Sequence, residues 1–483
     1  MRGTNTVQRS FGMAQNEYLS NFSYIFIPFS LEKAAHFIPF DKAIKDSGQW
    51  EPVGDKIQYL HRYVSDRLVS RETNGETVAS MFRYRFKKSC GADAGLFFDR
   101  PYRTAPTTFQ DEENVTFDFR IADVQLFLFN TTVCVMAFRL QFENDDPLHI
   151  AAAQYHLRKI DKESIYATAD NGTESSGTFM DLSQKILEAP IRAYPSDFFF
   201  YAAKRNARAN FLTYIDIPRQ DDIARKLYYL KWCYHDGFDY EPCCEEQDAV
   251  NYMPDPSKHF GISPSAAVCM VHRTRENREF VENTFQKNFR DQYFFTYVLL
   301  LHQKYMMYLF LTKMSVGIDN DLELLESYKQ RLYEFETKYM FSRVSEVPQY
   351  QRFYDKVKQA FSLKEMFSDV QEPLARLVEI QRQQDNERQN AHDKRLNAAL
   401  IILSLLAIFS AITDATGIVS ELDWLIPTVA SRVIQLIATG FVIVCSVFLL
   451  GRLFSLKSKR KACYTESSAA EKKRKSKKSE HRE

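Results

Sequence analysis

Two apolar runs close to the C-terminus constrain this chain more than any other feature of its sequence. Residues 396–412 contain Asn397, Ser404 and Ser410 as their only polar side chains, and residues 433–450 are almost as apolar. Each run approaches the length of a helix that crosses a bilayer, about 20 residues. A buried core helix is the alternative, but two adjacent runs of this length at one end of a chain favour two transmembrane helices.

The charges around the two runs predict their orientation. Lys and Arg lie before the first run and after the second, whereas residues 413–431 contain three acids and no Lys or Arg. The positive-inside rule places both termini in the cytoplasm and the acidic loop outside. Residues 455–483 carry eleven Lys or Arg and four Glu, a net charge of +7, which suits an anionic lipid surface. The predicted location is the inner (plasma) membrane, as a multi-pass protein.

Composition limits what the rest of the chain can do. The 483 residues carry a formal net charge of only +1, so a uniformly basic surface for direct nucleic-acid binding is not expected. The eight cysteines form no CxxC pair, which indicates free thiols in a reducing compartment. The N-terminal segment has no apolar region of the kind found in secretory signals. Most of the chain is therefore predicted to be cytosolic.

The N-terminal half predicts a mixture of strands and helices. Residues 24–29 and 82–86 are rich in aromatic and β-branched side chains, as strands are. Residues 124–129 and 133–142, separated by a short polar turn, predict a β-hairpin. The predicted fold class is therefore an α+β cytosolic domain followed by a long stalk helix and two C-terminal transmembrane helices.

From about residue 276 the pattern becomes helical. Residues 293–311 are strongly apolar, but His302, Gln303 and Lys304 lie at their centre, and a central Lys costs about 2.5–3.5 kcal/mol on insertion scales. A helix buried in the soluble part or between subunits is expected instead. Leucines and aromatics from 322 to 339 recur at helical spacing, and a last helix is expected to start near Pro373.

The predicted organisation has seven parts. They are a cytosolic mixed α/β domain (1–265), a helical region (266–372), a stalk helix (373–395), a first span (396–412), an external acidic loop (413–432), a second span (433–454) and a basic cytosolic tail (455–483).

One face of the predicted stalk and first span carries small and polar side chains at heptad spacing. In a membrane such residues face a bundle interior or a water-filled path, so a ring of these helices would form a pore. Leu400 would be an apolar constriction and Asp414 an acidic outer mouth. Close packing of two helices through small residues is the alternative. The eight predicted pore-lining residues, called the heptad stripe below, are Asn390, Asp393, Asn397, Leu400, Ser404, Ala407, Ala411 and Asp414.

The segment after the first run carries a family resemblance. Its Gly417, its Glu421–Leu422 pair and its Trp424 are similar to the external loop of the CorA family of divalent-cation channels. That family's loop has Gly-Met-Asn, whereas this chain has Gly followed by Ile and Val. The resemblance implies a homopentamer lined by its first spans, without the family's magnesium filter. The expected filter-loop residues are Gly417, Ile418, Val419, Glu421 and Asp423.

The lost filter and the enlarged aromatic soluble domain resemble a CorA-like subgroup associated with type III CRISPR antiviral systems. This resemblance implies a non-enzymatic homo-oligomeric ion channel in the lipid bilayer, gated from the cytosol by a nucleotide second messenger of the S-adenosylmethionine–AMP type. No cofactor is required, although magnesium could be the permeant or regulatory ion. Two alternatives remain open: a constitutive magnesium or cobalt transporter with a divergent filter, and a membrane-anchored receptor or scaffold without a pore.

Two further clusters contain residue types that are common in binding sites. Tyr201, Lys204, Arg205 and Arg208 combine an aromatic ring with cations, which suits stacking on a base and contact with a phosphate. A helix with a solvated basic face is the alternative. Cys233, His235, Cys243 and Cys244 lack zinc-ribbon spacing, so no metal site is expected. Nucleotide-binding, metalloprotease and nucleophile–base motifs are missing from the sequence, so no enzyme is predicted.

Overall fold

A computed structural model describes residues 20–421, apart from 55–56, 69–70, 74–75, 79, 169–171, 173, 195, 198–207, 219, 236, 239, 241–248 and 316–321, together with Val433, Ile437 and Gly440. The chain divides into two compact units, residues 1–379 and 380–483. The predicted mixed α/β domain and helical region thus belong to one unit. Each unit is described by itself.

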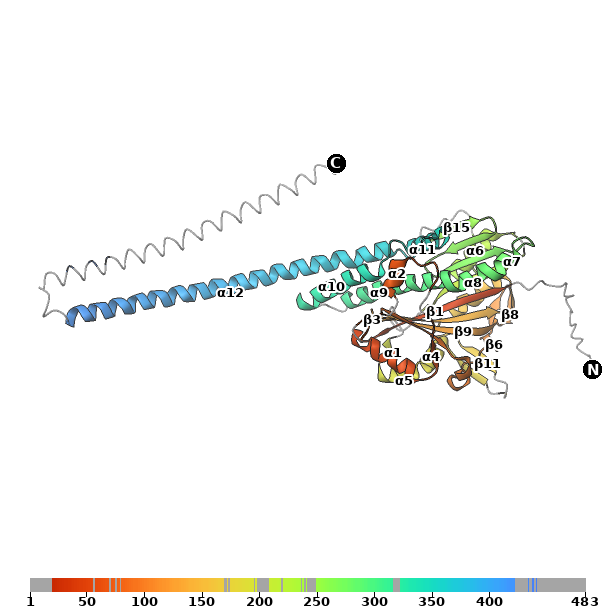
Figure 1. Cartoon of the computed structure of the whole chain (residues 1–483), viewed down its shortest axis with the longest axis horizontal. Coiled ribbons are helices and arrows are strands. Elements are labelled where there is room, and N and C mark those ends of the chain that lie inside the picture. The colour runs from red at the N-terminus through yellow and green to blue at the C-terminus, as the bar shows by residue number, and fades with distance from the viewer. Residues whose placement is uncertain are drawn as a thin grey trace, which may run out of the picture. The chain divides into compact units, whose positions relative to one another are not determined.

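One large mixed sheet organises the first unit (Figure 1). Thirteen of the described strands belong to it, and its main path runs β12-β11-β6-β9-β10-β1-β14-β17-β16-β15. The strands are β1 (Asn21–Leu31), β2 (Trp50–Pro52), β3 (Arg71–Thr73), β4 (Glu76–Val78), β5 (Met81–Phe86), β6 (Pro101–Thr104), β7 (Thr107–Phe109), β8 (Glu112–Val115), β9 (Asp118–Phe129), β10 (Val133–Phe142), β11 (Ile165–Thr168), β12 (Glu174–Gly177), β13 (Ser196–Asp197), β14 (Asn210–Ile217), β15 (Val250–Asp255), β16 (Lys258–Ile262) and β17 (Ala266–His272).

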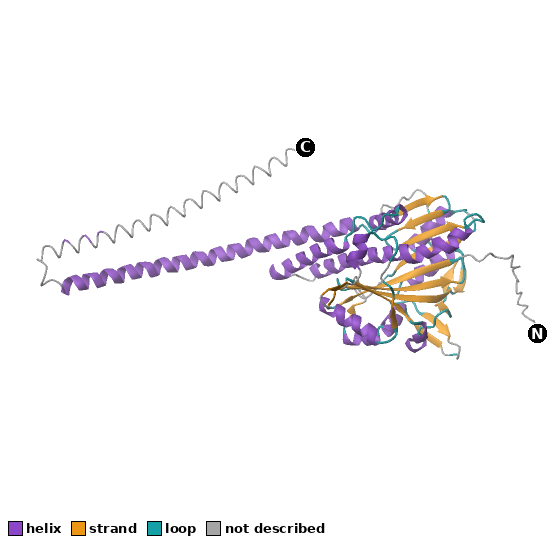
Figure 2. Cartoon of the chain, in the orientation of Figure 1, coloured by secondary structure: helices purple, strands orange, loops and turns teal. Residues whose placement is uncertain are grey.

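Helices lie on both sides of the sheet (Figure 2). Residues 278–315 form a continuous helical run that includes two π-helical segments, Val281–Phe285 and Phe289–Tyr293. The α-helices are α1 (Phe37–Asp46), α2 (Arg62–Leu68), α3 (Pro147–Leu157), α4 (Phe179–Ile186), α5 (Glu188–Ala193), α6 (Ile223–Trp232), α7 (Arg278–Phe280), α8 (Gln286–Asn288), α9 (Phe294–Ser315), α10 (Leu322–Tyr339), α11 (Pro348–Ala360) and α12 (Leu363–Glu421).

The central strand β1 shows why the sheet needs helices on both faces. Every residue of β1 is buried. Because side chains alternate across a strand, Ile25 and Ile27 enter a first core with α1 and α3–α6. Tyr24 and Phe26 enter a second core with α9–α11 and the start of α12. The expected strands at 24–29 and 82–86 are confirmed within β1 and β5.

The predicted hairpin is confirmed by β9 and β10. They pair antiparallel from Leu128 and Cys134 to Phe119 and Phe142. Thr132 in the connecting turn has a positive φ of 79° and is buried. This turn brings polar groups of the sheet next to α9 and α10.

Helix α9 is the aromatic helix expected at 293–311, and it is buried within this chain. Its three central polar side chains have partners inside the first unit. His302 Nε2 lies 2.7 Å from the Thr131 hydroxyl, Gln303 donates to the Tyr339 carbonyl, and Lys304 Nζ donates to the Pro264 carbonyl at 2.9 Å. The burial of polar groups within an apolar helix is tolerated here because each makes such a bond.

The prediction of two transmembrane helices is wrong for the part of the chain that the structure describes. In that part no helix is long and apolar enough to cross a membrane. The run 396–412 has only 17 residues, and Asp414 follows it in the same helix, so the apolar length falls short of about 20 residues. This finding also overturns the membrane assignment and the multi-pass inner-membrane location. The second predicted span, 433–454, lies outside the described residues except for Val433, Ile437 and Gly440.

The last helix also differs from the prediction at both ends. It begins at Leu363, and Pro373 lies inside it. A proline inside a helix costs about 3 kcal/mol, but Leu363 and Val370 are buried in the second core and stabilise the preceding turns. At the other end the helix continues to Glu421, through the first residues of the predicted loop.

Removing a ring from the second core tests its role in stability. Phe294 is fully buried, and its ring lies 4.2 Å from that of Tyr24. Phe294→Ala should lower the free energy of unfolding by about 3–5 kcal/mol, because it leaves a cavity that the sheet and helices cannot close. Phe280→Ala, at a ring that is 51% exposed, should change it by less than about 0.5 kcal/mol in the same urea titrations. Equal losses in both variants would contradict the assigned core.

The buried amine of Lys304 predicts a pH dependence. Burial lowers the pKa of Lys304 to about 7, whereas an unfolded lysine titrates near 10.4. Between these values the unfolded chain binds more protons, so this group makes stability rise with pH, and below pH 7 its contribution no longer changes. Lys304→Met should flatten the slope of unfolding free energy between pH 7 and 9, relative to the wild type. Lys42→Met, at an exposed lysine, should leave that slope unchanged.

Candidate self-association surface on the long helix

Helix α12 carries most of the predicted site residues. In the first unit its beginning is held by Leu363, Val370, Leu374 and Val378, which are buried in the second core. The last three recur at spacings of four residues and so lie on one face of the helix. This apolar face explains why the helix is firmly packed at its start.

From residue 386 onward the described side chains of α12 lie outside the two cores. Every residue from 386 to 400 is exposed. Residues 386–395 are charged or polar apart from Ala391, so water can solvate them. Arg388 lies 3.7 Å from Asp385, one turn away, which is an exposed pair of small energetic value.

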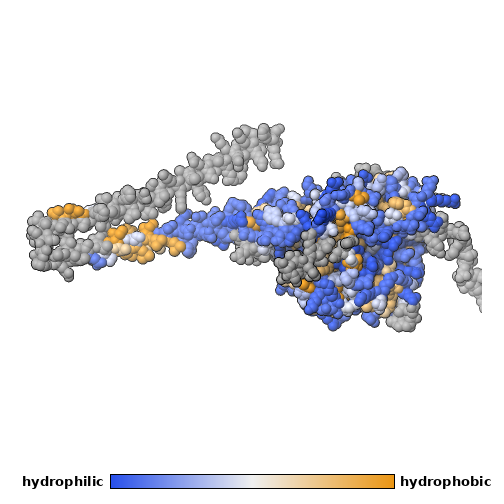
Figure 3. All heavy atoms as spheres, in the orientation of Figure 1, coloured by the Kyte–Doolittle hydropathy of each residue, from blue (hydrophilic) through white to orange (hydrophobic). Residues whose placement is uncertain are grey.

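The apolar part of α12 is exposed as well. Figure 3 shows apolar side chains gathered on the helix next to its hydrophilic stretch. Leu396 is 52% exposed, Leu400 59% and Leu403 61%. These three lie at positions i, i+4 and i+7, on one face. Ile402 and Leu406, 59% and 60% exposed, lie on a neighbouring face. A contiguous apolar patch of this kind marks an interaction surface.

The heptad stripe lies along the same side of the helix. Its positions alternate in steps of three and four residues, the pattern of a coiled-coil seam. With a rise of 1.5 Å per residue, the stripe is about 36 Å long. Seven of its eight members are exposed, and the side chain of Ala411 is not described. By contrast Ile401, Leu405 and Ile408, each of which directly follows a residue of the stripe, are half-buried.

Ser404 contributes less polarity to the stripe than its sequence suggests. Its hydroxyl donates to the Leu400 carbonyl of the preceding turn at 2.8 Å. Such back-bonding satisfies the hydroxyl inside its own helix. Around Leu400 the stripe is therefore apolar in character.

The filter-loop residues are not on a loop where the structure describes them. Gly417, Ile418, Val419 and Glu421 lie in the last turns of α12, and Asp423 lies outside the described residues. A single glycine weakens a helix by only about 1 kcal/mol, so Gly417 does not end it.

The predicted ligand-binding residues are mostly outside the described part of the chain. Tyr201, Lys204 and Arg205 belong to it, and only Arg208 is described, exposed just before β14. Burial and the nearby Arg208 charge lower the pKa of Arg158. The predicted ligand-binding cluster therefore stays a prediction.

Two of the four metal-ligand candidates, Cys233 and His235, are described. The buried Cys233 thiol donates to Gln154 Oε1 at 3.8 Å, whereas the His235 ring packs against Tyr155 at 4.4 Å. Cys243 and Cys244 lie outside the described residues. Among those described, no group of three or more His, Cys, Asp or Glu is placed to hold a metal ion.

One cavity was missed by the sequence predictions. It lies between the β9–β10 turn, α9 and α10, and three of its lining residues are Lys313, Arg331 and Lys338. Arg331 and Lys338 are seven residues apart, so helical spacing alone would place them on one face of α10. The lining residues from α9 and from the β9–β10 turn join those of α10 only in the tertiary structure.

Comparisons with protein-family models, with curated proteins and with solved structures found no match for this chain. The CorA-like resemblance, the pore and the gating ligand therefore stay predictions.

Thiol reactivity tests the environment of the cysteines. Burial raises the pKa of Cys233 to about 12, and Cys134 and Cys269 are likewise buried with raised pKa values. Iodoacetamide at pH 8, followed by peptide mapping, should modify the half-buried Cys90 in the native protein and spare these three until urea unfolds the chain. Rapid native labelling of Cys233 would contradict its placement in the first core.

Proposed function

We propose that the chain works as a homo-oligomer whose copies associate along the heptad stripe of α12, and whose α/β unit receives a signal. The observation that carries this proposal is the exposed apolar patch of Leu396, Leu400 and Leu403 beside the stripe. The first unit buries its own apolar faces in two cores, whereas this patch has no cover among the described residues.

The energetics favour covering the patch. Fully burying a leucine or isoleucine side chain lowers the free energy by about 1.5–3 kcal/mol. The side chains of the patch are slightly more than half exposed, so covering each of them would lower the free energy by about 1 kcal/mol or more. Association costs about 4–15 kcal/mol in lost freedom. Several such side chains from every copy are therefore needed, and Leu396, Leu400 and Leu403 supply three on one face of each helix.

The spacing favours another copy of the same helix as the cover. A strict three–four alternation over 25 residues keeps the stripe facing a partner helix along its length. Asn390 and Asn397 are polar residues at seam positions, and such residues can set the register of the associated helices and their number. Arg382 and Glu387, which flank the seam, carry opposite charges that can face each other across two parallel copies.

The finer functional predictions rest on the resemblance and not on the exposed patch. A nucleotide as the signal, ion conduction, and magnesium or cobalt transport are expectations from the resemblance. The resemblance supports a ligand-responsive oligomer, and the exposed stripe supports the oligomer.

A charge placed in the seam tests the proposal. Leu400→Glu should shift the full chain toward monomer in sedimentation velocity and weaken association at least tenfold, because every copy would place its new carboxylate beside the others. Leu377→Glu makes the same change at an exposed leucine of α12 outside the stripe, and should leave the sedimentation coefficient unchanged.

Leu406→Glu separates self-association from binding to lipid. Leu406 is as exposed as Leu400 but lies off the seam, so its effect on the oligomer should be much smaller. The proposal would be overturned in favour of a lipid surface by two results together. The wild-type chain would be monomeric without lipid, and both substitutions would weaken its sedimentation with anionic vesicles equally.

A further inference from the structure

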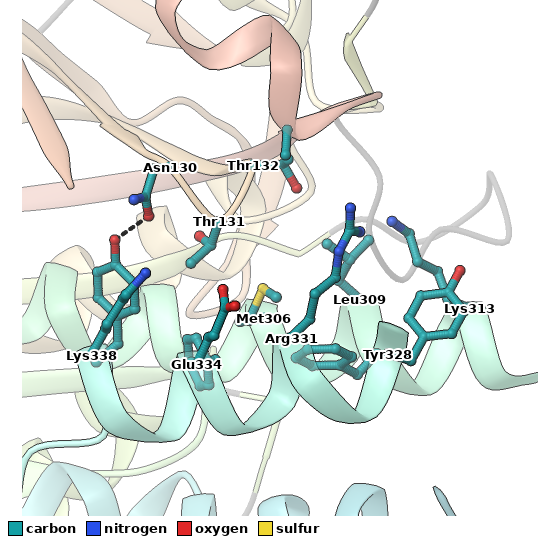
Figure 4. Close-up of a pocket in the computed structure, with 14 residues that line it drawn as sticks. Asn130, Thr131, Thr132, Met306, Leu309, Lys313, Tyr328, Arg331, Glu334 and Lys338 are labelled. Atoms are coloured by element: carbon teal, nitrogen blue, oxygen red, sulfur yellow. Dashed lines mark hydrogen bonds between the residues drawn. The ribbon is translucent and has the colours of Figure 1, made fainter. Parts of the chain in front are cut away.

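The cavity between the β9–β10 turn, α9 and α10 has the features of a ligand site (Figure 4). Its volume is about 140 Å³. This is several times what one water needs, about 10–15 Å³, but below the 300–1,000 Å³ of pockets that hold drug-sized molecules. The cavity therefore suits a small group or one end of a larger ligand.

Cations outnumber acids in its lining. Lys313 from α9 and Arg331 from α10 point toward each other in Figure 4, and Lys338 lies two turns along α10. Burial and the Arg331 charge both lower the pKa of Lys313, which agrees with two like charges held close together. Three cations and one acid, Glu334, give the described lining a net charge of +2.

These cations have no carboxylate partner among the described residues. None of the ion pairs within the described ranges includes Lys313, Arg331 or Lys338, and the Glu334 carboxylate accepts from Gln330 Nε2 at 3.2 Å. Residues 316–321, which follow α9, lie outside the described part. Like charges brought together at a cavity are stabilised when an anion occupies it.

The remaining walls of the cavity are held by a packed polar network. The Tyr339 hydroxyl bonds to Asn130 Oδ1 and to the Ser80 carbonyl. Thr131 bonds to His302, whose ring stacks on Phe129 at 3.9 Å. Burial lowers the pKa of His302 to about 3, so this histidine is neutral and does not add to the charge. The cations thus face a rigid turn, and little ordering is needed when a ligand binds.

We propose that this cavity binds a phosphate group of a small anionic ligand, with Arg331 and Lys313 as its principal contacts. The guanidinium of Arg331 presents a planar fork that matches two phosphate oxygens, and the Lys313 amine supplies a point charge. Lys338 adds charge at the rim, and the Thr131 hydroxyl offers a polar wall. The volume accommodates phosphate or pyrophosphate and leaves any larger ligand partly outside.

Calorimetric titration of the full chain with inorganic pyrophosphate tests this site. The wild type should bind it, and Arg331→Gln and Lys313→Gln should each weaken binding at least tenfold, as expected for lost charge-assisted bonds. Glu334→Gln should tighten binding by about twofold to fivefold, because it removes the one negative charge in the described lining. Lys329→Gln, a lysine of α10 outside the cavity, should bind within twofold of the wild type.

Two outcomes would overturn the site. One is a wild-type chain that gives no binding heat with millimolar pyrophosphate or phosphate. The other is binding that Lys329→Gln weakens as much as Arg331→Gln, which would indicate a general surface attraction. Sulfate and AMP in parallel titrations report whether the site prefers phosphate and whether an attached nucleoside adds affinity. The oligomeric state of Arg331→Gln should match the wild type, so failure here is distinct from failure of the association along α12.

Discussion

The burial of the central sheet on both faces is the constraint on which the rest of the first unit depends. A strand such as β1, with no exposed residue, exists only if helices cover both of its sides. The aromatic side chains make this covering specific, because rings such as Phe294 and Tyr24 meet at 4.2 Å in one arrangement. Helix α9 is thereby held against the sheet, and its polar centre must find partners there.

Those partners connect the core to the cavity. His302 lies against Phe129 and bonds to Thr131, so the same contacts that allow a histidine inside an apolar helix also fix the β9–β10 turn. The turn, α9 and α10 then enclose a basic cavity. These contacts hold the turn in place beside the cavity, so little ordering is needed when a small anion binds.

The second part of helix α12 is exposed, whereas the central sheet is buried. Its first turns are stabilised by burial of Val370 and Leu374, but from residue 386 to 400 every described side chain is exposed. Water solvates the polar side chains on all faces of this stretch, whereas the leucines that follow are not at their lowest free energy there. The need to cover them is the physical reason for expecting association with further copies.

The sequence by itself determined the elements whose patterns are local. The hairpin of β9 and β10, the strands within β1 and β5, the buried aromatic helix α9 and the heptad spacing on α12 follow from periodicity and composition. Apolar content and flanking charge could not settle the membrane spans, since the described part of α12 continues through Asp414 to Glu421 as one helix with too short an apolar stretch. Only the tertiary structure decided that Pro373 lies inside a helix, because distant core contacts outweigh its local preference. Only the tertiary structure, likewise, brought Lys313 and Arg331 together, because their meeting depends on how α9 and α10 pack against the sheet.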